Sequence, residues 1–360
     1  MKTLHRYIGR EVLRSVAVTT ALFIFIILMD RASFIAQTVL GQGVSFSDFL
    51  SVLIKTVPSF LGIVIPISFV ISVLITFLQM GSSNELVALK SCGVSLKEIS
   101  KPVLALGLIF SLLSFLSVMF LAPKSNVAVK KEIEELLRKK ITMNIVPKSF
   151  SSNFPGVTFY VEKVFPQKGY IFNFMVSIQK KSQLITLFGE KGILRTKGDS
   201  VYLDVLNGNA QIVNWSKLQD FRFLKFKSYT VELYRFSKKE LFRAQKYKTL
   251  FELLKDREKK ESSTEIFKRL SLSLAPLIVG VLAFSIAVSV PRGGLGIGIV
   301  SGLLIVVLYY VLYTLSKKFA LKAGLPPLAL MPDVVFGLLA LFLYKKALRE
   351  EIKLEMGARW

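Results

Sequence analysis

The sequence has very few of the side chains from which catalytic and metal sites are built. Its 360 residues include one histidine, His5, and one cysteine, Cys92. A zinc site needs several such ligands, and Ser-His-Asp or Cys-His catalysis needs a histidine beside the nucleophile, so neither can be built within the chain. An intrachain disulfide is excluded because it needs two cysteines. We therefore predict no metal site and no cofactor.

A nucleotide-binding loop is missing as well. No Lys-Ser or Lys-Thr pair follows a glycine at P-loop spacing, so the chain cannot bind ATP in that way. The glycines of residues 293–302 look superficially like a dinucleotide loop, but Ile299 takes the last glycine position and no strand precedes it. We interpret Gly294, Gly298 and Gly302 as overlapping small-xxx-small pairs for close helix packing. The chain is predicted not to be an enzyme, and any ATP is used by a partner.

Long stretches of the sequence lack charge. The mean hydropathy is +0.53, and 52% of the residues are hydrophobic, which is too apolar for an ordinary water-soluble protein. A membrane-spanning helix needs roughly 20 apolar residues, and four charge-free windows reach that length: residues 56–84, 102–123, 270–291 and 293–316. A fifth span is predicted at 15–42, interrupted by Asp30 and Arg31. A sixth is predicted at 325–344, provided that Asp333 lies near the headgroups.

Basic residues predict how these spans are oriented. Six spans place both termini on one side, and Lys and Arg are enriched in cytoplasmic loops. The larger set lies at the termini and in the loops on their side: Lys2, Arg6, Arg10, Arg14, Lys90, Lys97, Lys101, Arg292, Lys345, Lys346, Arg349, Lys353 and Arg359. The smaller set lies on the other side: Arg31, Lys55, Lys317, Lys318 and Lys322. We predict cytoplasmic termini and an external middle segment. A cleaved signal peptide is the disfavoured alternative, because the sequence has no small-x-small cleavage site.

The middle segment, residues 124–263, differs in composition from the rest of the chain. Short runs alternate apolar and polar residues, as in residues 157–162 and 201–205, which indicates strands with one buried face. Further strands are predicted at 170–178, 184–188, 211–215 and 221–233, with turns at 166–169, 197–199 and 207–208. The prediction is an antiparallel sandwich or jelly roll, flanked by helices at 127–140 and 239–260. Residues 1–123 and 264–360 are predicted to hold three membrane helices each.

Two short segments are candidate functional sites. In residues 82–93, Ser82 or Ser83 can cap a short helix, Glu85 suits its first turn and Gly93 can end it. Leu86 and Leu89 then share a face, so the segment is either a plain turn or a docking helix for a cytoplasmic partner. Asp30 and Arg31 lie roughly 24 Å beyond Arg14 in a continuous helix. They are either a functional pair or snorkelling anchors, and adjacent helix positions make them poor partners for each other.

Taken together, four sequence stretches resemble the F/G permease family (LptF/LptG) of the lipopolysaccharide-export ABC transporter over essentially the whole chain. The stretches are Arg6-Tyr-Ile-Gly-Arg-Glu11, Asn84-Glu-Leu-Val-Ala-Leu-Lys-Ser-Cys-Gly-Val-Ser95, Pro291-Arg-Gly-Gly294 and Leu325-Pro-Pro327 with Pro332. Each is weak alone, but the combination is specific. The Ser91-to-Ser95 wording and the run Gln219-Asp-Phe-Arg222 lean towards the F member.

The resemblance implies an inner-membrane protein with six helices, split three and three around a periplasmic jelly roll. It also implies a second permease subunit of similar fold, two cytoplasmic ATPase copies and a periplasmic bridge protein that receives lipopolysaccharide. Residues 82–93 correspond to the family's coupling helix, with Glu85 at the acidic position that faces the ATPase and with Leu86, Leu89, Ser91 and Gly93 as further coupling residues. Arg31 falls where the family contacts lipid phosphates, and Asp30, Lys55, Lys317 and Lys322 are further lipid-binding candidates, although more basic residues are expected near Arg31.

Charge is consistent with this interpretation, because Lys and Arg outnumber Asp and Glu in the middle segment, which suits an anionic lipid. Generic basicity is the alternative, since the whole chain has a pI of about 10.0. The competing hypotheses are a permease for another lipid or lipoprotein, a membrane-anchored scaffold that moves nothing, and a lipid-modifying enzyme. No nucleic-acid partner is expected.

Overall fold

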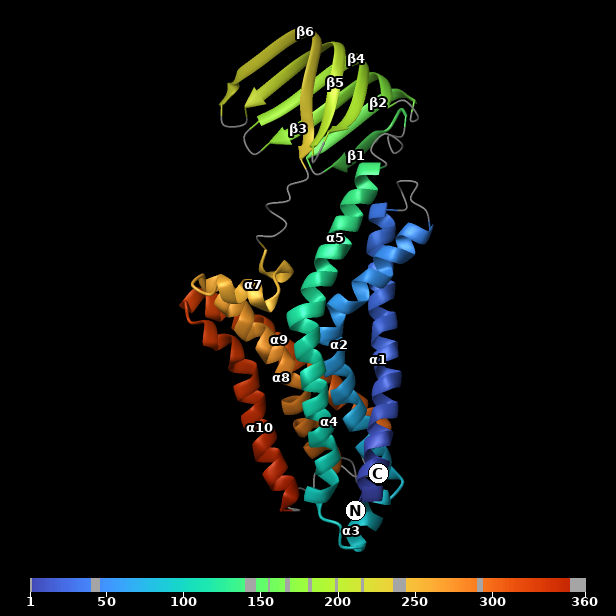
Figure 1. Cartoon of the computed structure of the whole chain (residues 1–360), viewed down its shortest axis with the longest axis vertical. Helices are drawn as coiled ribbons and strands as arrows, with labels where there is room; N and C mark the ends of the chain where they lie inside the picture. The colour runs from blue at the N-terminus through green and yellow to red at the C-terminus, as the bar shows by residue number, and fades with distance from the viewer. Residues whose placement is uncertain are drawn as a thin grey trace, which may run out of the picture. The chain divides into compact units, whose positions relative to one another are not determined.

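The computed structural model contains helices in both terminal thirds of the chain and a β-sheet in the middle third (Figure 1). It divides into two units, residues 1–31, 55–128 and 244–360 in the first and residues 32–54 and 129–243 in the second. The structure describes residues 2–39, 46–139, 147–154, 156–165, 169–180, 183–197, 200–214, 217–235, 244–289 and 294–349. The predicted turns at 166–169 and 197–199, the start of the predicted helix at 239–260 and the motif residue Arg292 lie partly or wholly outside these ranges.

Within these ranges, six helices are long and apolar enough to cross a membrane, which confirms the predicted six spans. The first two are α1 (Lys2–Val39) and α2 (Phe46–Ser82). The third runs through α4 (Leu96–Leu116), the π-helical turn η2 (Ser117–Leu121) and α5 (Ala122–Lys139). The last three are α8 (Lys260–Ser289), α9 (Gly294–Ala323) and α10 (Met331–Leu348), the last preceded by the 3-10 turn η5 (Pro326–Leu330). The helical membrane protein with an inserted β domain is therefore the observed fold class.

The helices pack around aromatic rings and glycines. Phe69 of α2 is fully buried, and a Cβ at Gly280 of α8 would lie 2.5 Å from its ring. Phe77 meets Phe284 edge to face at 4.8 Å. A Cβ at Gly302 of α9 would lie 2.6 Å from Leu74, so this glycine allows the close packing predicted for it. The surroundings of Gly294 and Gly298 are not among those that the structure describes.

Prolines inside two of these helices leave backbone carbonyls without their usual partners, and one serine compensates for both. Pro66 in α2 and Pro276 in α8 cannot donate to the carbonyls four residues earlier, those of Gly62 and Leu272. The fully buried Ser114 of α4 donates to both carbonyl oxygens, at 3.5 and 3.4 Å. A hydroxyl placed in this way is shared between two backbone groups inside the helical core, so Ser114 links α4 to both α2 and α8.

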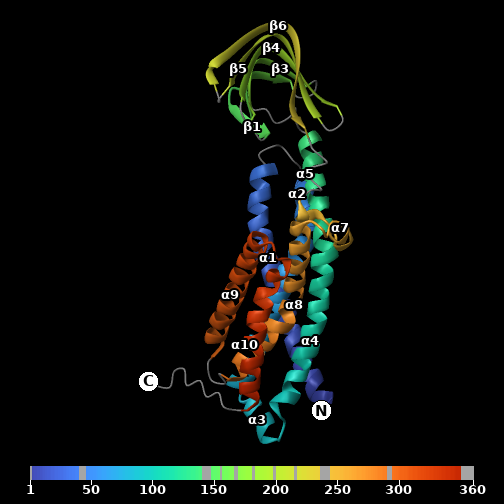
Figure 2. The same cartoon turned by 90° about the vertical axis from the view of Figure 1, so that its left-hand side faces the viewer.

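The inserted domain is one antiparallel sheet whose six strands pair in sequence order. The strands are β1 (Phe150–Phe154), β2 (Val157–Phe165), β3 (Tyr170–Lys180), β4 (Gln183–Lys197), β5 (Ser200–Asn214) and β6 (Lys217–Arg235). The sheet arches over on itself (Figure 2), burying Phe159, Val176 and Leu187 on its inner face. The described strands thus form a single curved meander in place of the two packed layers of the predicted sandwich.

The turn predicted at Asn207–Gly208 is wrong, because β5 runs through it without reversing. Asn207 has a φ of 50°, and its neighbour across β4 on β3, Asn173, has a φ of 47°. At both asparagines the buried positions switch between odd and even residue numbers. On β3, Ile171 is buried before the asparagine and Phe174 after it; on β5, Val205 is buried before it and Ala210 after it. Each asparagine therefore has its backbone in the left-handed region and marks a crease in a continuous strand. Asparagine tolerates positive φ better than most residues do.

The residues before α8 form two short elements where one helix was predicted at 239–260. We call residues 244–259 the connector; it contains the 3-10 turn η4 (Gln245–Tyr247) and the helix α7 (Leu250–Lys255). Extended backbone at Lys248 and Thr249 separates the two elements. Thr249 then starts α7 with a capping box, because its side chain and that of Glu252 satisfy each other's backbone N–H groups.

Candidate functional site

The loop between the second and third spans carries a short helix, α3 (Glu85–Ser91). Neither Ser82 nor Ser83 is its N-cap as predicted; the cap is Asn84, with a φ of 62° and no side-chain cap bond. The reason is that α2 continues to Ser82, whose hydroxyl donates to the Gln79 carbonyl oxygen at 2.9 Å. Gly93, with a φ of 77°, follows the helix, and the next amide, that of Val94, donates to the Leu89 carbonyl oxygen.

Glu85 is held in place by two hydroxyl groups. Its carboxylate accepts hydrogen bonds from Tyr7 of α1 at 3.0 Å and from Ser83 at 2.9 Å. Leu86 is 2% exposed and packs into the helical core, with Leu89 packed partly against it, so the apolar side of α3 faces inward. Ser91 remains exposed and donates to the Val87 carbonyl oxygen. The helix is thus anchored to the core, and Glu85 lines a cleft of about 360 Å³ between α1 and α2.

Arg31 and Asp30 form an ion pair after all, contrary to the expectation from their helix positions. The Arg31 Nε lies 3.7 Å from an Asp30 carboxylate oxygen, because the long arginine side chain can reach back along the helix. The pair is loose: Asp30 is 75% exposed, and the Arg31 guanidinium also lies 4.9 Å from the centroid of the Phe60 ring. Arg31 is 40% exposed, so it retains access to a ligand.

The remaining predicted lipid contacts differ in exposure. Lys55 of α2 and Lys322 of α9 are exposed, whereas Lys317 of α9 is half-buried and donates to Glu265 of α8 at 3.1 Å. Arg31 belongs to α1, Lys55 to α2, and Lys317 and Lys322 to α9. The predicted cations therefore occupy three helices, and Lys317 already has an anionic partner.

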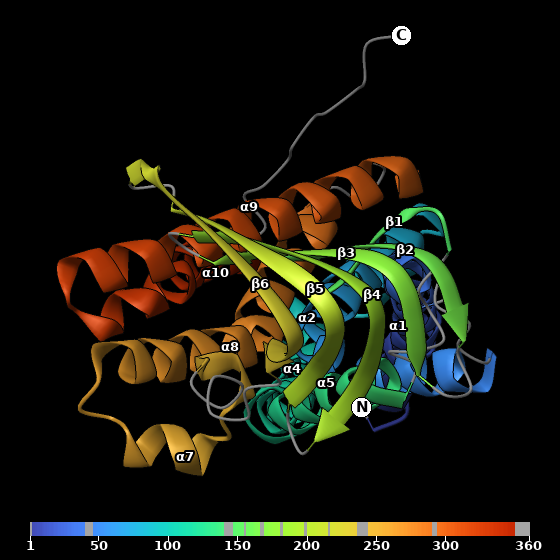
Figure 3. The same ribbon diagram turned by 90° about the horizontal axis from the view of Figure 1, so that it is seen from above.

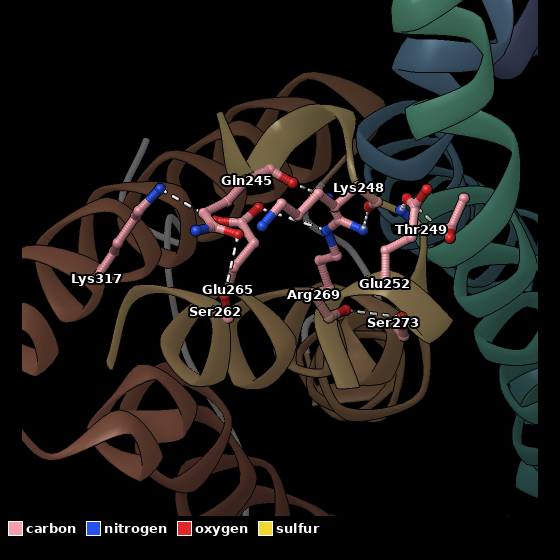
Figure 4. A network of polar contacts seen from close by, with 9 residues as sticks. All are labelled: Gln245, Lys248, Thr249, Glu252, Ser262, Glu265, Arg269, Ser273 and Lys317. Carbon is pink, nitrogen blue, oxygen red and sulfur yellow. Dashed lines mark hydrogen bonds and ion pairs between the residues drawn. The ribbon is translucent and has the colours of Figure 1, made fainter. Parts of the chain in front are cut away.

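A buried charge cluster around Glu265 was missed by sequence reasoning (Figure 4). We define it as Glu265, Lys268 and Arg269 of α8 with Lys317 of α9. Glu265 and Arg269 are 7% and 4% exposed, and the Arg269 Nε donates to Glu265 at 3.4 Å. Lys268 lies 5.2 Å from the centroid of the Tyr313 ring. The i, i+4 spacing of Glu265 and Arg269 could have suggested a pair, but nothing in the sequence points to Lys317 as a member of the cluster.

Arg269 also ties the connector to the charge cluster. Its two terminal nitrogens donate to the Lys248 and Gln245 carbonyl oxygens at 2.8 and 2.9 Å, as Figure 4 shows. Lys248 in turn donates to Asp256 across α7, and this hydrogen bond lowers the pKa of the Asp256 carboxyl group. The carbonyl oxygens of Gln245 and Lys248, which lie outside any α-helix, thus accept hydrogen bonds from a charged donor. These two bonds hold the connector against α8.

The β domain carries an open pocket of about 1030 Å³. Its lining is largely aromatic and apolar, with charged residues at several points: Tyr160, Met175, Phe188, Phe226, Glu190, Lys225 and Lys227. Tyr160, Met175, Phe188 and Lys225 belong to one cross-strand row that runs from β2 to β6. Apolar rings beside lysines are chemically suited to an amphipathic, anionic molecule.

Comparison with known proteins agrees with this architecture. A family model described as "Lipopolysaccharide export system permease LptF/LptG" matches residues 6–346, nearly the whole chain. The chain is also similar to an uncharacterized protein of Rickettsia prowazekii (strain Madrid E), with 23% identity over 172 residues. That similarity covers 47% of this chain and 47% of the relative, so the chain matches about half of that relative's length.

Proposed function

Because this chain belongs to the lipopolysaccharide export permease family LptF/LptG, we propose that it is one permease subunit of an ABC transporter that extracts lipopolysaccharide from the membrane's outer leaflet. The match across residues 6–346 carries the proposal. The proposed assembly contains a second permease of similar fold, two ATPase copies that bind the ATP, and a periplasmic bridge protein that accepts the lipid. The choice between F and G member stays a prediction.

The β domain supports a role in handling lipid. Its pocket combines Phe188, Phe226 and Met175 with Lys225 and Lys227, which matches acyl chains and phosphates of an anionic glycolipid. We propose that lipid leaving the membrane passes along this row of side chains. Lys322 is exposed, and Arg31 has only a loose ion pair, at 3.7 Å, with the exposed Asp30. Both are therefore better placed to meet phosphates than Lys317, which bonds at 3.1 Å to the buried Glu265.

The α3 helix supports a role in receiving ATP-driven motion. This short helix between two spans packs Leu86 into the core and holds the half-buried Glu85 by a hydrogen bond from Tyr7 of α1. A rigid mount transmits a displacement to α1 and α2, because packed interiors have low compressibility. We propose that Glu85 accepts a charge-assisted hydrogen bond from a basic residue of the ATPase.

Lipid retention tests the proposal directly. Replacing Phe188 with aspartate introduces a charge into the pocket and removes an apolar contact worth about 1.5–3 kcal/mol, so lipid affinity should fall roughly 10- to 100-fold. The measurement is mass spectrometry of lipid retained by the complex in mild detergent. The matched control is Phe223→Asp, because Phe223 is 55% exposed on β6 and does not line the pocket. Equal lipid retention by both variants would rule out the pocket, and a different retained lipid would rule out lipopolysaccharide.

Membrane orientation gives a second test. We propose that both termini and α3 are cytoplasmic and that the β domain is periplasmic, since basic residues concentrate on the side of the termini. A cysteine at the exposed position Lys163 of β2 should then react with a membrane-impermeant thiol reagent in intact spheroplasts. The exposed native Cys92 should react only after the membrane is opened. Labelling in the opposite order would reverse the proposed orientation.

A further inference from the structure

The helix α7 has an apolar side that the described residues leave largely exposed. Phe251 and Leu254, three residues apart and so on one face of the helix, are 72% and 46% exposed, whereas Leu253 is fully buried against the protein. Basic residues outnumber acidic ones in the connector, five (Lys246, Lys248, Lys255, Arg257 and Lys259) to three (Glu252, Asp256 and Glu258), and of the five Lys248 is mostly buried in its bond to Asp256. An exposed aromatic and aliphatic pair among lysines is the pattern of a segment that lies in a membrane interface.

The position of α7 matches that depth. The Phe251 ring lies 5.9 Å from that of Phe120, a residue of η2 in the third span. Phe120 precedes Lys124, the residue that ends the charge-free window of that span. Phe251 therefore lies where the hydrocarbon region gives way to headgroups. In Figure 1, α7 runs across the end of α8, and Figure 3 shows it at the periphery of the helices.

The neighbouring surface indicates what covers α7. Leu116 and Leu121, on the same span as Phe120, are 43% and 44% exposed, as expected for side chains that face acyl chains. The apolar side of α7 continues this lipid-facing strip through the ring contact between Phe120 and Phe251. The lysines and arginines of the connector suit anionic lipid headgroups better than a second apolar protein surface.

We propose that the connector is a membrane-surface element: α7 inserts Phe251 and Leu254 into the headgroup–acyl boundary, while its basic residues contact anionic headgroups. Arg269 fixes this element to α8 through the Gln245 and Lys248 carbonyls. The chain that leaves β6 towards α8 thus has a fixed point on the bilayer surface. The proposal depends on the six spans and not on which lipid is transported, so it can fail independently of the proposed function.

Tryptophan fluorescence in nanodiscs tests this element in the full-length chain. The native Trp215 and Trp360 are replaced by phenylalanine, and single tryptophans are introduced as Phe251→Trp and, separately, Leu254→Trp. The nanodiscs contain phosphatidylglycerol and phosphatidylcholine brominated on the upper acyl chain. The control is Lys163→Trp, at an exposed position on β2. Size-exclusion chromatography verifies that each variant is folded. If one of the two tryptophan variants of α7 does not fold, the other still tests the proposal.

Both reporters should be quenched several times more strongly by the brominated lipid than the Lys163→Trp control is. Iodide, a water-borne quencher, should act chiefly on the control. Two outcomes would overturn the proposal. Quenching of both α7 reporters by iodide would place α7 in water, and protection from both quenchers would mean that protein covers α7 in place of lipid.

Discussion

Replacing Glu265 with leucine is expected to lower the free energy of unfolding by about 3–5 kcal/mol, because it leaves buried cations without their anion. Arg269 is 4% exposed, and Lys317 is half-buried and bonded to the same carboxylate. Without Glu265, like charges on α8 and α9 face each other where water is scarce. The measurement is denaturant- or detergent-induced unfolding of the purified chain, followed by circular dichroism.

A matched control separates this effect from the loss of any carboxylate. Glu258→Leu removes an exposed carboxylate of the connector and should change stability by less than about 0.5 kcal/mol. A triple variant, Glu265→Leu with Arg269→Leu and Lys317→Met, should recover part of the loss, since apolar side chains can replace a buried ion pair without large cost. If Glu265→Leu alone unfolds like the parent chain, the cluster is solvated and contributes little to stability.

The sequence alone was sufficient for the spans, because lipid imposes a simple requirement of length and apolarity. The exact ends were less predictable. The charge-free window of the fourth span begins at Leu270, whereas α8 begins at Lys260. The extra turns at the start of α8 carry Glu265, Lys268 and Arg269. Their charges are accommodated there because Glu265 bonds to Lys317 and Arg269 bonds to the connector carbonyls. Such pairing depends on a second helix and cannot be read from local charge.

The strands β2, β3, β4 and β6 of the β domain were predicted, whereas β1 was missed and β5 was predicted as two strands separated by a turn. Alternation in residues 157–161 and 201–205 identified buried faces correctly, because period two follows from the pleat itself. Asn207–Gly208 has the composition of a hairpin turn, yet there β5 keeps its pairing with both β4 and β6. Gly208 pairs with Gly189 of β4, and this pairing keeps β5 in the sheet. The Phe174 ring packs against Gly189 so closely that a Cβ there would lie 2.6 Å from it. Close packing across the crease is a tertiary fact that turn propensity does not contain.

In the candidate site too, the local features were predicted from the sequence and the long-range contacts were not. Residues 82–93 contain a helix and a terminating glycine, both of which local capping rules predict. The N-cap was wrong because α2 extends into Ser82, and the hydrogen bond from Tyr7 to Glu85 joins residues 78 positions apart. The roles of Glu85, Arg31 and Lys322 stay predictions that require a bound partner or lipid to test.

Replacing Glu85 with lysine is expected to abolish binding of the ATPase or transport while leaving the membrane fold intact. The carboxylate lies in the first turn of α3, where it contributes about 0.3–1 kcal/mol to the helix, so loss of charge alone costs little folding free energy. A lysine would also place like charges across the proposed docking surface, at a cost of several kcal/mol. The measurement is copurification of the ATPase with the permease, together with ATP-driven release of lipid from proteoliposomes.

The choice of comparison variants makes this test specific to the carboxylate on α3. Glu98→Lys makes the same change in the first turn of α4, the next helix, where Glu98 pairs with Lys101, and should preserve ATPase binding. Tyr7→Phe removes one hydroxyl donor from Glu85 but keeps its charge, so it should weaken coupling less than Glu85→Lys does. Glu85→Gln should fall between the two, because an amide still accepts hydrogen bonds but offers no charge to a basic partner. Should Glu85→Lys retain both the ATPase and lipid release, α3 would be only a turn between spans, and the energy of ATP hydrolysis would have to enter through another surface.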